Sequence, residues 1–346
     1  MIAAITREIL LRQDYLPDTK IQSIYFGGGT PSILTAEQLD MLFDTIHKNF
    51  KVSENIEITL EANPDDITPE KLSIWHNCGI NRLSVGIQSF HEQVLTWMNR
   101  AHNAEQALQC LQLINDSDIN NYSADLIYGV PISDNSLLLD DLEKLISFNP
   151  SHISAYCLTI EPKTVFGHAL KNGKLEEVSE DTAASQFLMI NEQLTAHNYL
   201  QYEVSNYCKP GYESFHNNNY WQGIPYLGLG PGAHSFNGKN RHYSVSNNAI
   251  YLKKLKENEL ALDTDYLLES DRINEYIMTS LRTASGLSFE RLKNKYEHDY
   301  LQKNNDLLKR WQAAGLCEIN NEHLQLTLKG MLLADKLAAD TFLVDW

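Results

Sequence analysis

Short apolar runs that each end near a chain breaker recur along the first half of the sequence. They cover residues 24–26, 56–61, 82–88, 122–128 and 153–160, and glycine, proline or serine follows each within a few positions. Short apolar runs bounded by breakers are typical of buried strands. The pattern therefore predicts five strands, spaced about one βα unit apart.

The segments between these runs have the apolar spacing of helices. After Thr35, which can cap a helix, apolar residues recur on one helix face: Leu39, Leu42, Phe43 and Ile46. The same spacing predicts helices over residues 69–76, 104–115 and 138–148. Strands that alternate with helices indicate an α/β fold with a parallel sheet, either barrel-like or open.

Polar residues stand where the predicted strands end, which is where βα barrels carry their chemistry. Glu61, Gln88 and Asp125 occupy such positions, and three glycines at 27–29 follow the first strand. Glycines let a ligand approach the backbone closely, although a plain tight turn is the alternative. Asp125 lies in a hydrophobic run, where a lone carboxylate is costly without a partner.

The second half of the chain changes character twice. Residues 166–245 are richer in Asn, Tyr and Gly, with predicted helices over 166–172 and 180–197. From residue 267 the pattern predicts three helices and a short hairpin: 271–283, 289–296, 301–314, and 316–319 with 323–327. We therefore predict three domains: a βα barrel core over 1–165, a barrel extension over 166–265, and a C-terminal domain over 266–346.

Seven motifs in order carry a resemblance that covers nearly the whole chain. They are FGGGTP (26–31), LEANP (60–64), GIQSF (86–90), DLIYGVP (125–131), LTIEP (158–162), HNNNYW (216–221) and GLGPGAH (228–234). Together they resemble the radical S-adenosylmethionine (SAM) family of oxygen-independent coproporphyrinogen III oxidase-like proteins. The HNNNYW pattern is similar to the haem chaperone branch. The resemblance implies an incomplete (β/α) radical SAM-type partial barrel with a C-terminal winged-helix-like α+β domain.

The resemblance also implies a SAM site. Its candidate residues are Gly28, Gly29, Thr30, Glu61, Gln88, Arg100, Asp125 and Thr159. The two glycines and Thr30 resemble the family's contact with the methionine end, and Arg100 resembles the partner of the SAM carboxylate, which a guanidinium matches bidentately. Without the family, Arg100 would be interpreted as a surface arginine and Thr159 as ordinary strand filler.

Haem or a porphyrin is the second ligand that the resemblance implies. His216, Tyr220 and His234 are its candidate contacts. An imidazole can ligate haem iron, and a tyrosine ring can cover a porphyrin face. A hydrogen-bonded structural histidine is the alternative. The resemblance further implies respiratory membrane enzymes as haem acceptors, and a homodimer is a candidate assembly.

The cysteines depart from the family pattern, in which a Cys-x3-Cys-x2-Cys loop holds a [4Fe–4S] cluster. The five cysteines here are Cys78, Cys110, Cys157, Cys208 and Cys317, and no two lie within three residues of each other. Cluster ligands are therefore absent from this sequence, and we expect no radical chemistry from it. Residues 1–10 resemble the helix that follows the cluster loop. A truncated gene product and a natural loss of the cluster both explain this, and the retained pocket residues favour truncation.

Composition predicts a soluble cytoplasmic protein. No apolar run approaches the roughly 18 residues of a membrane span, and residues 1–13 lack the basic start of a signal peptide. Five scattered cysteines suit a reducing compartment. The net charge of −17 repels phosphate backbones, which argues against nucleic acid as a partner.

These features predict a haem chaperone that binds haem and SAM and delivers haem to respiratory enzymes, here truncated or cluster-less. Three alternatives stay open: a coproporphyrinogen III oxidase-like enzyme of porphyrin biosynthesis, a non-catalytic haem-binding sensor, and an unrelated barrel aldolase or lyase. The HNNNYW pattern argues against the first. The last predicts a Schiff-base lysine at a strand end, and none of the five strand ends carries one.

Overall fold

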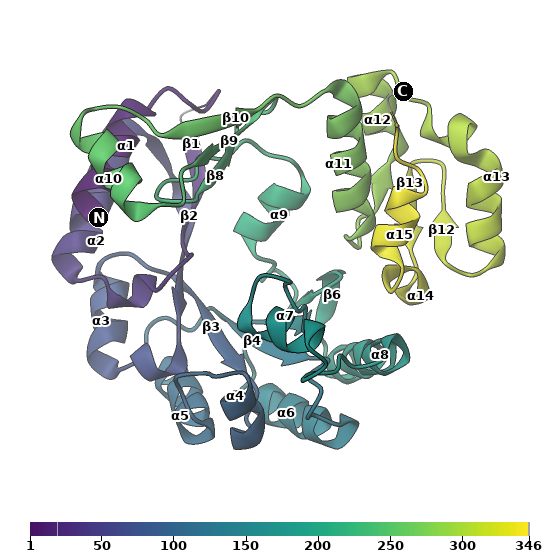
Figure 1. Cartoon of the computed structure of the whole chain (residues 1–346), viewed down its shortest axis with the longest axis horizontal. Helices are drawn as coiled ribbons and strands as arrows, with labels where there is room; N and C mark the ends of the chain where they lie inside the picture. The colour runs from purple at the N-terminus through teal and green to yellow at the C-terminus, as the bar shows by residue number, and fades with distance from the viewer. Residues whose placement is uncertain (19, 345–346) are drawn as a thin grey trace. The chain divides into compact units, whose positions relative to one another are not determined.

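The computed structural model describes residues 1–18 and 20–344 (Figure 1). The chain forms two compact units, each built from separated segments. Unit 1 comprises Met1–Ile24, Leu34–Glu57 and Phe215–Trp346, and unit 2 comprises Tyr25–Ile33 and Ile58–Ser214. The predicted domain boundaries near residues 165 and 265 stay a prediction.

A seven-stranded sheet has the order β1-β2-β3-β4-β5-β7-β6. The strands are β1 (Lys20–Phe26), β2 (Lys51–Ala62), β3 (Arg82–Gln88), β4 (Tyr122–Tyr128), β5 (His152–Cys157), β6 (Leu200–Glu203) and β7 (Asn206–Cys208). Strands β2 to β5 pair in parallel, and β7 pairs antiparallel with both β5 and β6. Within the described residues β1 and β6 are the end strands, so the sheet is an open partial barrel and the predicted fold class is confirmed.

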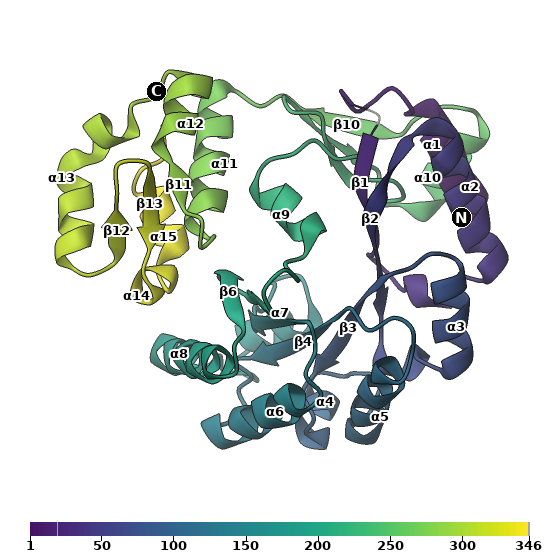
Figure 2. The ribbon, with the colours of Figure 1, turned by 180° about the vertical axis from the view of Figure 1, so that it is seen from behind.

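The connections in unit 2 are helical, as the apolar spacing predicts. They include α3 (Pro69–Asn77), α4 (Glu92–Trp97), α5 (Ala104–Asn115), α6 (Asn135–Ser147), α7 (Val165–Lys171) and α8 (Glu180–Ala196), with short 3-10 turns η1 (Pro31–Ile33) and η2 (Pro64–Asp66). Helices α4, α5 and α6 lie together on one side of strands β3 and β4 in both views (Figures 1 and 2). The opposite side of these strands carries polar side chains.

Strand β3 shows how the sequence separates the two faces. Its residues Leu83, Val85 and Ile87 are fully buried, while Ser84, Gly86 and Gln88 line a pocket on the other face. Side chains alternate between the faces of a strand, so this period of two directs the apolar set toward the helices and the polar set away from them.

The fifth strand is shorter than the predicted residues 153–160. Register pairs Tyr128 of β4 with Cys157 of β5, and β4 ends there because Gly129 turns the chain at a φ of 72°. Beyond Cys157, the Leu158 N–H still donates to the Tyr128 carbonyl at 2.8 Å, and no further pairing follows in the described residues. Thr159 therefore lies in a loop. The antiparallel strands β6 and β7 were not predicted.

Unit 1 contains two smaller sheets. Strands β8 (His234–Phe236), β9 (Arg241–Ser244) and β10 (Leu262–Asp265) form one, in the order β10-β9-β8. The C-terminal region has the order α11 (Glu269–Leu281), β11 (Leu287–Ser288), α12 (Phe289–Tyr296), α13 (Tyr300–Ala313), β12 (Cys317–Ile319) and β13 (His323–Leu326), followed by α14 (Leu328–Met331) and α15 (Ala334–Ala339). The three predicted helices and the hairpin are present, and β11 adds a third strand.

The first helix, α1 (Ile2–Leu11), carries a buried ion pair at its C-terminal end, and Glu8 of this pair also bonds to later parts of unit 1. Glu8 Oε1 lies 3.1 Å from Arg12 Nη1, and both side chains are at most 2% exposed. Glu8 Oε2 also accepts hydrogen bonds from the Gly230 N–H at 2.9 Å and the Tyr251 hydroxyl at 2.6 Å. Two further helices, α2 (Ala36–Asn49) and α10 (Asn248–Lys256), belong to the same unit.

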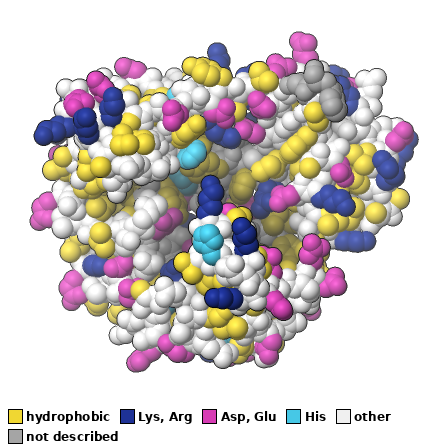
Figure 3. All heavy atoms as spheres, in the orientation of Figure 1, with side chains coloured by type: hydrophobic (Ala, Val, Ile, Leu, Met, Phe, Trp, Pro, Cys, Tyr) yellow, Lys and Arg dark blue, Asp and Glu magenta, His cyan; other side chains and the backbone are white. Residues whose placement is uncertain are grey.

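Surface chemistry is mixed on the face drawn in Figure 3, where acidic and basic side chains are interspersed. None of the helices in residues 1–18 and 20–344 has the length and apolarity that crossing a membrane requires.

Candidate functional site

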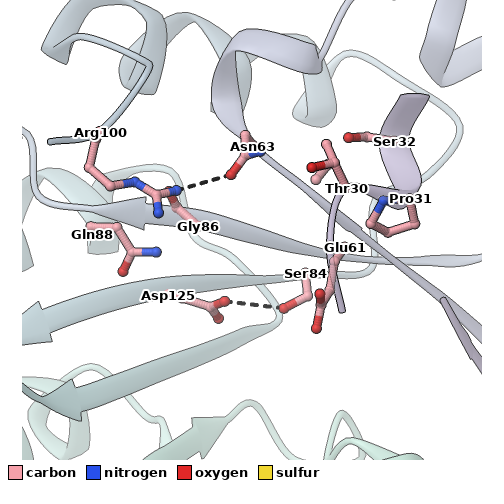
Figure 4. Close-up of a pocket in the computed structure, with 12 residues that line it drawn as sticks. Thr30, Pro31, Ser32, Glu61, Asn63, Ser84, Gly86, Gln88, Arg100 and Asp125 are labelled. Carbon is pink, nitrogen blue, oxygen red and sulfur yellow. Dashed lines mark hydrogen bonds between the residues drawn. The ribbon is translucent and has the colours of Figure 1, made fainter. Parts of the chain in front are cut away.

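A polar pocket of about 240 Å³ lies at the C-terminal ends of β1 to β4, entirely within unit 2 (Figure 4). Its lining residues are Gly29, Thr30, Pro31, Ser32, Glu61, Ala62, Asn63, Ser84, Gly86, Gln88, Arg100 and Asp125. Six residues of the predicted SAM site are among them: Gly29, Thr30, Glu61, Gln88, Arg100 and Asp125. Residues up to 96 positions apart in the sequence are thus brought together, as barrel topology predicts.

Glu61 is held against the glycine turn that follows β1. Its Oε1 accepts a hydrogen bond from the Tyr25 hydroxyl at 2.8 Å, and its Oε2 accepts one from the Gly28 N–H at 3.1 Å. Burial and the neighbouring Glu61 charge raise the pKa of Tyr25, so this phenol stays a donor. Gly28 and Gly29 both have positive φ, at 69° and 93°, a conformation that favours glycine.

Asp125 lies on β4 and faces the pocket among hydroxyl groups. Ser84 donates to its Oδ2 at 3.2 Å and Ser123 lies 3.0 Å from its Oδ1 (Figure 4 shows the Ser84 contact). Burial raises the pKa of Asp125 to about 6, while the surrounding serines oppose that shift. The carboxylate is therefore poised to change its charge near neutral pH.

Arg100, which follows α4, places its guanidinium over the pocket. Its Nη2 donates to Asn63 Oδ1 at 3.0 Å, while its buried Nε has no hydrogen-bond partner among the described residues. Burial lowers the pKa of Arg100, although Asp65 and Asp125 act in the opposite direction. An arginine nevertheless stays protonated in proteins, so the group is a cation with donor capacity to spare.

Gln88 has an unusual backbone at the end of β3. Its φ is 66°, rare for a residue with a side chain, and the pairing of β3 with β4 shifts register between Val85 and Gln88. Its Oε1 is buried and has no hydrogen-bond partner in the described part of the chain. Strained backbone and an unpartnered amide oxygen are both features that a bound ligand explains.

The remaining residues of the predicted SAM site lie apart from the lining set. Gly28 touches the pocket only through its hydrogen bond to Glu61. Thr159 is exposed, does not line the pocket, and its hydroxyl lies 3.5 Å from the Cys157 carbonyl. The sequence interpretation missed Ser84, although it shares the two-residue spacing of Gly86 and Gln88 and this alternation could have identified it.

The predicted haem contacts lie in unit 1. His216 and Tyr220 are on α9 (Phe215–Trp221), where their rings meet edge to face at 4.9 Å between centroids. Glu57 of β2 accepts hydrogen bonds from the backbone N–H groups of Phe215 at 3.1 Å and His216 at 3.0 Å. A carboxylate at a helix start satisfies donors that the helix leaves open. This contact orients α9.

An aromatic row connects α9 with β8. Tyr220 lies 4.5 Å from Tyr226 between ring centroids, and Tyr226 lies 6.5 Å from Phe236. His234 precedes Phe236 by two residues and therefore leaves the same face of the strand. His234 is exposed and stacks on Tyr243 at 5.6 Å. Ring contacts thus link His216 and Tyr220 to Phe236, and His234 stands two residues before Phe236 on the same strand of unit 1.

The cysteines do not gather. Cys110, Cys208 and Cys317 are buried, Cys78 is half-buried and Cys157 is exposed, and none forms a disulfide. Among residues 1–18 and 20–344 no group of three His, Cys, Asp or Glu side chains is placed to hold a metal ion. The residues described here therefore do not form a ligand set for an iron–sulfur cluster.

Comparisons with known proteins match two parts of the chain. The Radical SAM superfamily matches residues 3–145, and the HemN C-terminal domain matches residues 267–333. The solved coproporphyrinogen III oxidase HemN from Escherichia coli, a radical SAM enzyme, superposes with a TM-score of 0.80 over 97% of this chain and 81% of its own. At 22% identity that likeness concerns the fold.

Several relatives of higher identity are named heme chaperone HemW. The heme chaperone HemW of Bacillus subtilis is 33% identical over 93% of this chain and 85% of its own length. The heme chaperone HemW of Haemophilus influenzae is 35% identical over 92% of this chain and 84% of its own length. Identity at this level over most of both chains shows common membership, and the chain belongs to the heme chaperone HemW family of radical SAM proteins.

Proposed function

We propose that this chain is a haem chaperone that binds haem on the aromatic region around α9 and SAM in the polar pocket of unit 2. The observation that carries the proposal is the placement of His216 beside the exposed rings of Phe215 and Tyr220 on one short helix. Relatives named heme chaperone HemW support the same assignment.

The charges of the pocket suit SAM. The ligand carries a sulfonium, an ammonium and a carboxylate, and the pocket lining supplies two carboxylates, Glu61 and Asp125, and one guanidinium, Arg100. Opposite charges at these positions favour binding, and an arginine fork matches a carboxylate in particular. When bound, SAM supplies an electrophilic sulfonium centre, and the residues of the pocket hold and orient it.

Unpartnered polar atoms support the same ligand. Gln88 Oε1 and Arg100 Nε are buried without hydrogen-bond partners in the described residues. A buried polar atom without a partner costs about 1–3 kcal/mol, which a ligand with hydroxyl and carboxylate groups offsets. Thr30 and the backbone of Gly29, which line the pocket, add neutral hydrogen-bonding groups at the methionine end. Thr159 stays a weaker member of the proposed SAM site because it lies in an exposed loop.

Haem is proposed to lie against the aromatic region, where the His216 imidazole would hold its iron. The His216 Nδ1 atom lies 3.4 Å from the Ser23 hydroxyl, a contact that orients the imidazole. Second partners of this kind fix the ring orientation of metal-ligating histidines. Tyr220 then covers a porphyrin face, and His234 is the second candidate ligand.

Delivery of haem to respiratory membrane enzymes is the proposed outcome of binding at an exposed site. Phe215, Tyr220 and Ile224 are between 42% and 43% exposed, so a haem bound there stays open to contact by an acceptor. A surface of exposed apolar side chains is typical of binding sites. We also propose the homodimer and the cytoplasmic location that the sequence predicts.

Haem titration followed by absorbance tests the proposal. The parent chain is compared with His216→Ala and with His323→Ala, a half-buried histidine of β13, as the matched control. We expect His216→Ala to lose about tenfold or more in haem affinity, at least about 1.4 kcal/mol, and to change the Soret band, while His323→Ala matches the parent. Equal spectra and affinities in all three proteins would discard His216 as the ligand, and His234→Ala then tests the second candidate.

A further inference from the structure

Beneath the pocket, a chain of hydrogen bonds leads away from Asp125. The Ser123 hydroxyl lies 3.0 Å from Asp125 Oδ1 and 2.8 Å from His152 Nδ1. His152 Nε2 lies 2.8 Å from the Tyr202 hydroxyl. Ser123 and His152 are 1% and 0% exposed, whereas Tyr202 on β6 is half-buried. The chain therefore runs from the pocket, through the interior, to the end strand of the sheet.

These hydrogen bonds have two self-consistent directions, because a serine has one hydrogen and a neutral histidine carries one ring N–H. The Ser154 hydroxyl, 3.0 Å from the Ser123 hydroxyl, can donate to Ser123 in both. In the first, Tyr202 donates to His152 Nε2, His152 Nδ1–H donates to Ser123, and Ser123 donates to the ionised Asp125. In the second, the protonated Asp125 donates to Ser123, Ser123 donates to Nδ1, and Nε2–H donates to Tyr202. Each direction satisfies all three contacts and fixes one tautomer of His152.

We propose that Ser123, His152 and Tyr202 are positioning residues that couple the tautomer of His152 to the charge of Asp125. An ionised Asp125 selects the Nδ1–H tautomer and a protonated Asp125 selects the Nε2–H tautomer. The pocket thereby holds the carboxylate in one orientation, ready to accept hydrogen bonds from a ligand. The consequence for SAM rests on the proposed function, whereas the coupling itself is a property of the ligand-free chain.

Protons are conserved when Asp125 changes from the ionised to the protonated form. When Asp125 gains a proton, Ser123 gives its hydrogen to Oδ1 and receives the Nδ1 hydrogen of His152. His152 receives the Tyr202 hydrogen at Nε2, and the Tyr202 oxygen takes one proton from solvent. One proton enters, one hydrogen crosses each hydrogen bond, and only Asp125 changes its charge.

Surrounding groups favour this behaviour over protonation of the imidazole. Burial, with Arg82 nearby, holds the pKa of His152 well below its ordinary value, so the ring stays neutral in both states. Charged or titratable neighbours of Asp125 come from several elements: Arg82 of β3, Arg100, Tyr25 of β1 and Tyr156 of β5. The two arginines favour the ionised carboxylate, and burial opposes them. Asp125 is thus the group of this set that titrates near pH 6.

Nitrogen-15 NMR of the ligand-free, ¹⁵N-histidine-labelled chain tests the coupling, with His152 assigned by the loss of its signals in His152→Gln. We expect His152 to stay neutral while its two ring nitrogens exchange protonated and unprotonated shifts between about pH 5 and about pH 7.5, the range in which Asp125 changes charge. One unchanged tautomer across that range would overturn the proposal, and this measurement needs only the parent chain.

Two serine variants provide a matched comparison. Ser84 and Ser123 both contact Asp125, and only Ser123 belongs to the hydrogen-bond chain that leads to His152. Ser123→Ala is expected to abolish the pH-dependent exchange at His152. Ser84→Ala, which removes the contact to Oδ2, is expected to retain it with a shifted midpoint. Exchange that persists in Ser123→Ala, or that disappears in both variants, contradicts the coupling.

Adding SAM tests the proposed SAM site separately from the coupling between His152 and Asp125. At about pH 5.5, where Asp125 is mainly protonated, saturating SAM is expected to move His152 toward the Nδ1–H tautomer because the ligand favours the ionised carboxylate. Ligand-free exchange that does not respond to SAM would support the coupling and refute Asp125 as a SAM contact. Calorimetry is expected to show about tenfold weaker SAM binding in Ser123→Ala at neutral pH, from the loss of a hydrogen bond to a charged group.

Discussion

Gly27 and Glu61 approach each other so closely that a side chain on Gly27 has no room. A Cβ atom there would lie 2.8 Å from Glu61 Oε1 and 2.6 Å from the Tyr25 ring. Neighbouring Gly28 and Gly29 have open space around an added Cβ and are glycine-specific through their positive φ. The glycine triplet therefore serves two physical needs, close approach at its first position and backbone conformation at the other two.

Gly27→Ala is expected to push Glu61 and Tyr25 apart and to disturb the wall of the pocket. Overpacking of this kind costs about 1–3 kcal/mol of stability, and we expect SAM affinity to fall in parallel. Calorimetry and urea denaturation measure the two effects. Gly79→Ala is the control, since its φ of 96° makes it strained although its surroundings are open. It should lose stability and keep SAM affinity, and an unchanged SAM affinity in Gly27→Ala would contradict the close contact.

The stability of the chain is expected to depend on pH through Asp125. Folding raises the pKa of this carboxyl from 3.8 to about 6, so its contribution favours the folded state below pH 3.8 and is lost as the pH rises through 6. Relative to Asp125→Asn, the parent should gain at most about 3 kcal/mol as the pH falls from about 7 to about 4, at about 1.36 kcal/mol per pKa unit. Urea denaturation of both proteins across this range is the measurement. If the free energies of unfolding of both proteins changed with pH in the same way, burial of Asp125 would have no effect on stability.

Arg100→Lys is expected to weaken SAM binding although it keeps the charge. A lysine lacks the planar fork that matches a carboxylate and cannot replace the Nη2 contact to Asn63. The loss should be about 10–100-fold, corresponding to about 1.5–3 kcal/mol for a hydrogen bond to a charged group. Lys71→Gln is the control, because Lys71 pairs with Asp66 at 3.2 Å and does not line the pocket. Similar calorimetric curves for both variants would argue against Arg100 as the carboxylate partner.

Glu57→Ala is expected to loosen α9 without removing any proposed haem contact. The carboxylate accepts the first two N–H groups of that helix, and losing such a contact costs about 0.5–2 kcal/mol. Hydrogen exchange should accelerate over residues 215–221, and haem affinity should fall several-fold. Glu54→Ala, an exposed position on the same strand, serves as the comparison. An unchanged haem affinity in Glu57→Ala would mean that haem binding does not depend on the order of α9.

Glu8→Ala is expected to be the most destabilising of these changes. It leaves Arg12 as a buried unpaired cation, for which losses of about 3–5 kcal/mol are typical. Lys48→Ala offers the exposed counterpart, an i,i+4 pair with Asp44 in which both side chains are 74% exposed. That change should cost below about 0.5 kcal/mol. Denaturation midpoints decide the comparison, and equal losses would show that burial of the Glu8–Arg12 pair has no effect.

The local pattern of apolar and polar residues was enough to predict most helices and strands of the barrel. Predicted strands over 82–88 and 122–128 and the predicted helix over 104–115 coincide with β3, β4 and α5. The β6–β7 pair was missed because its strands are four and three residues long, too short to display a period of two. The fifth strand was predicted to be too long because its last paired residue, Cys157, is determined by where β4 ends. Strand β4 ends just before Gly129, which lies 28 residues before Cys157 in the sequence.

By itself, the sequence determined the residue types at the strand ends, the motifs of the family and the alternation that turns Ser84, Gly86 and Gln88 to one face. These follow from periods of two and 3.6 residues, which act over short distances. Tertiary structure alone decided that Tyr25 and Gly28 bind Glu61, that Arg100 reaches Asn63, and that Ser123 joins Asp125 to His152 and Tyr202. Those partners lie on different strands and loops, so only the register of the sheet and the packing of its connections bring them within hydrogen-bonding distance.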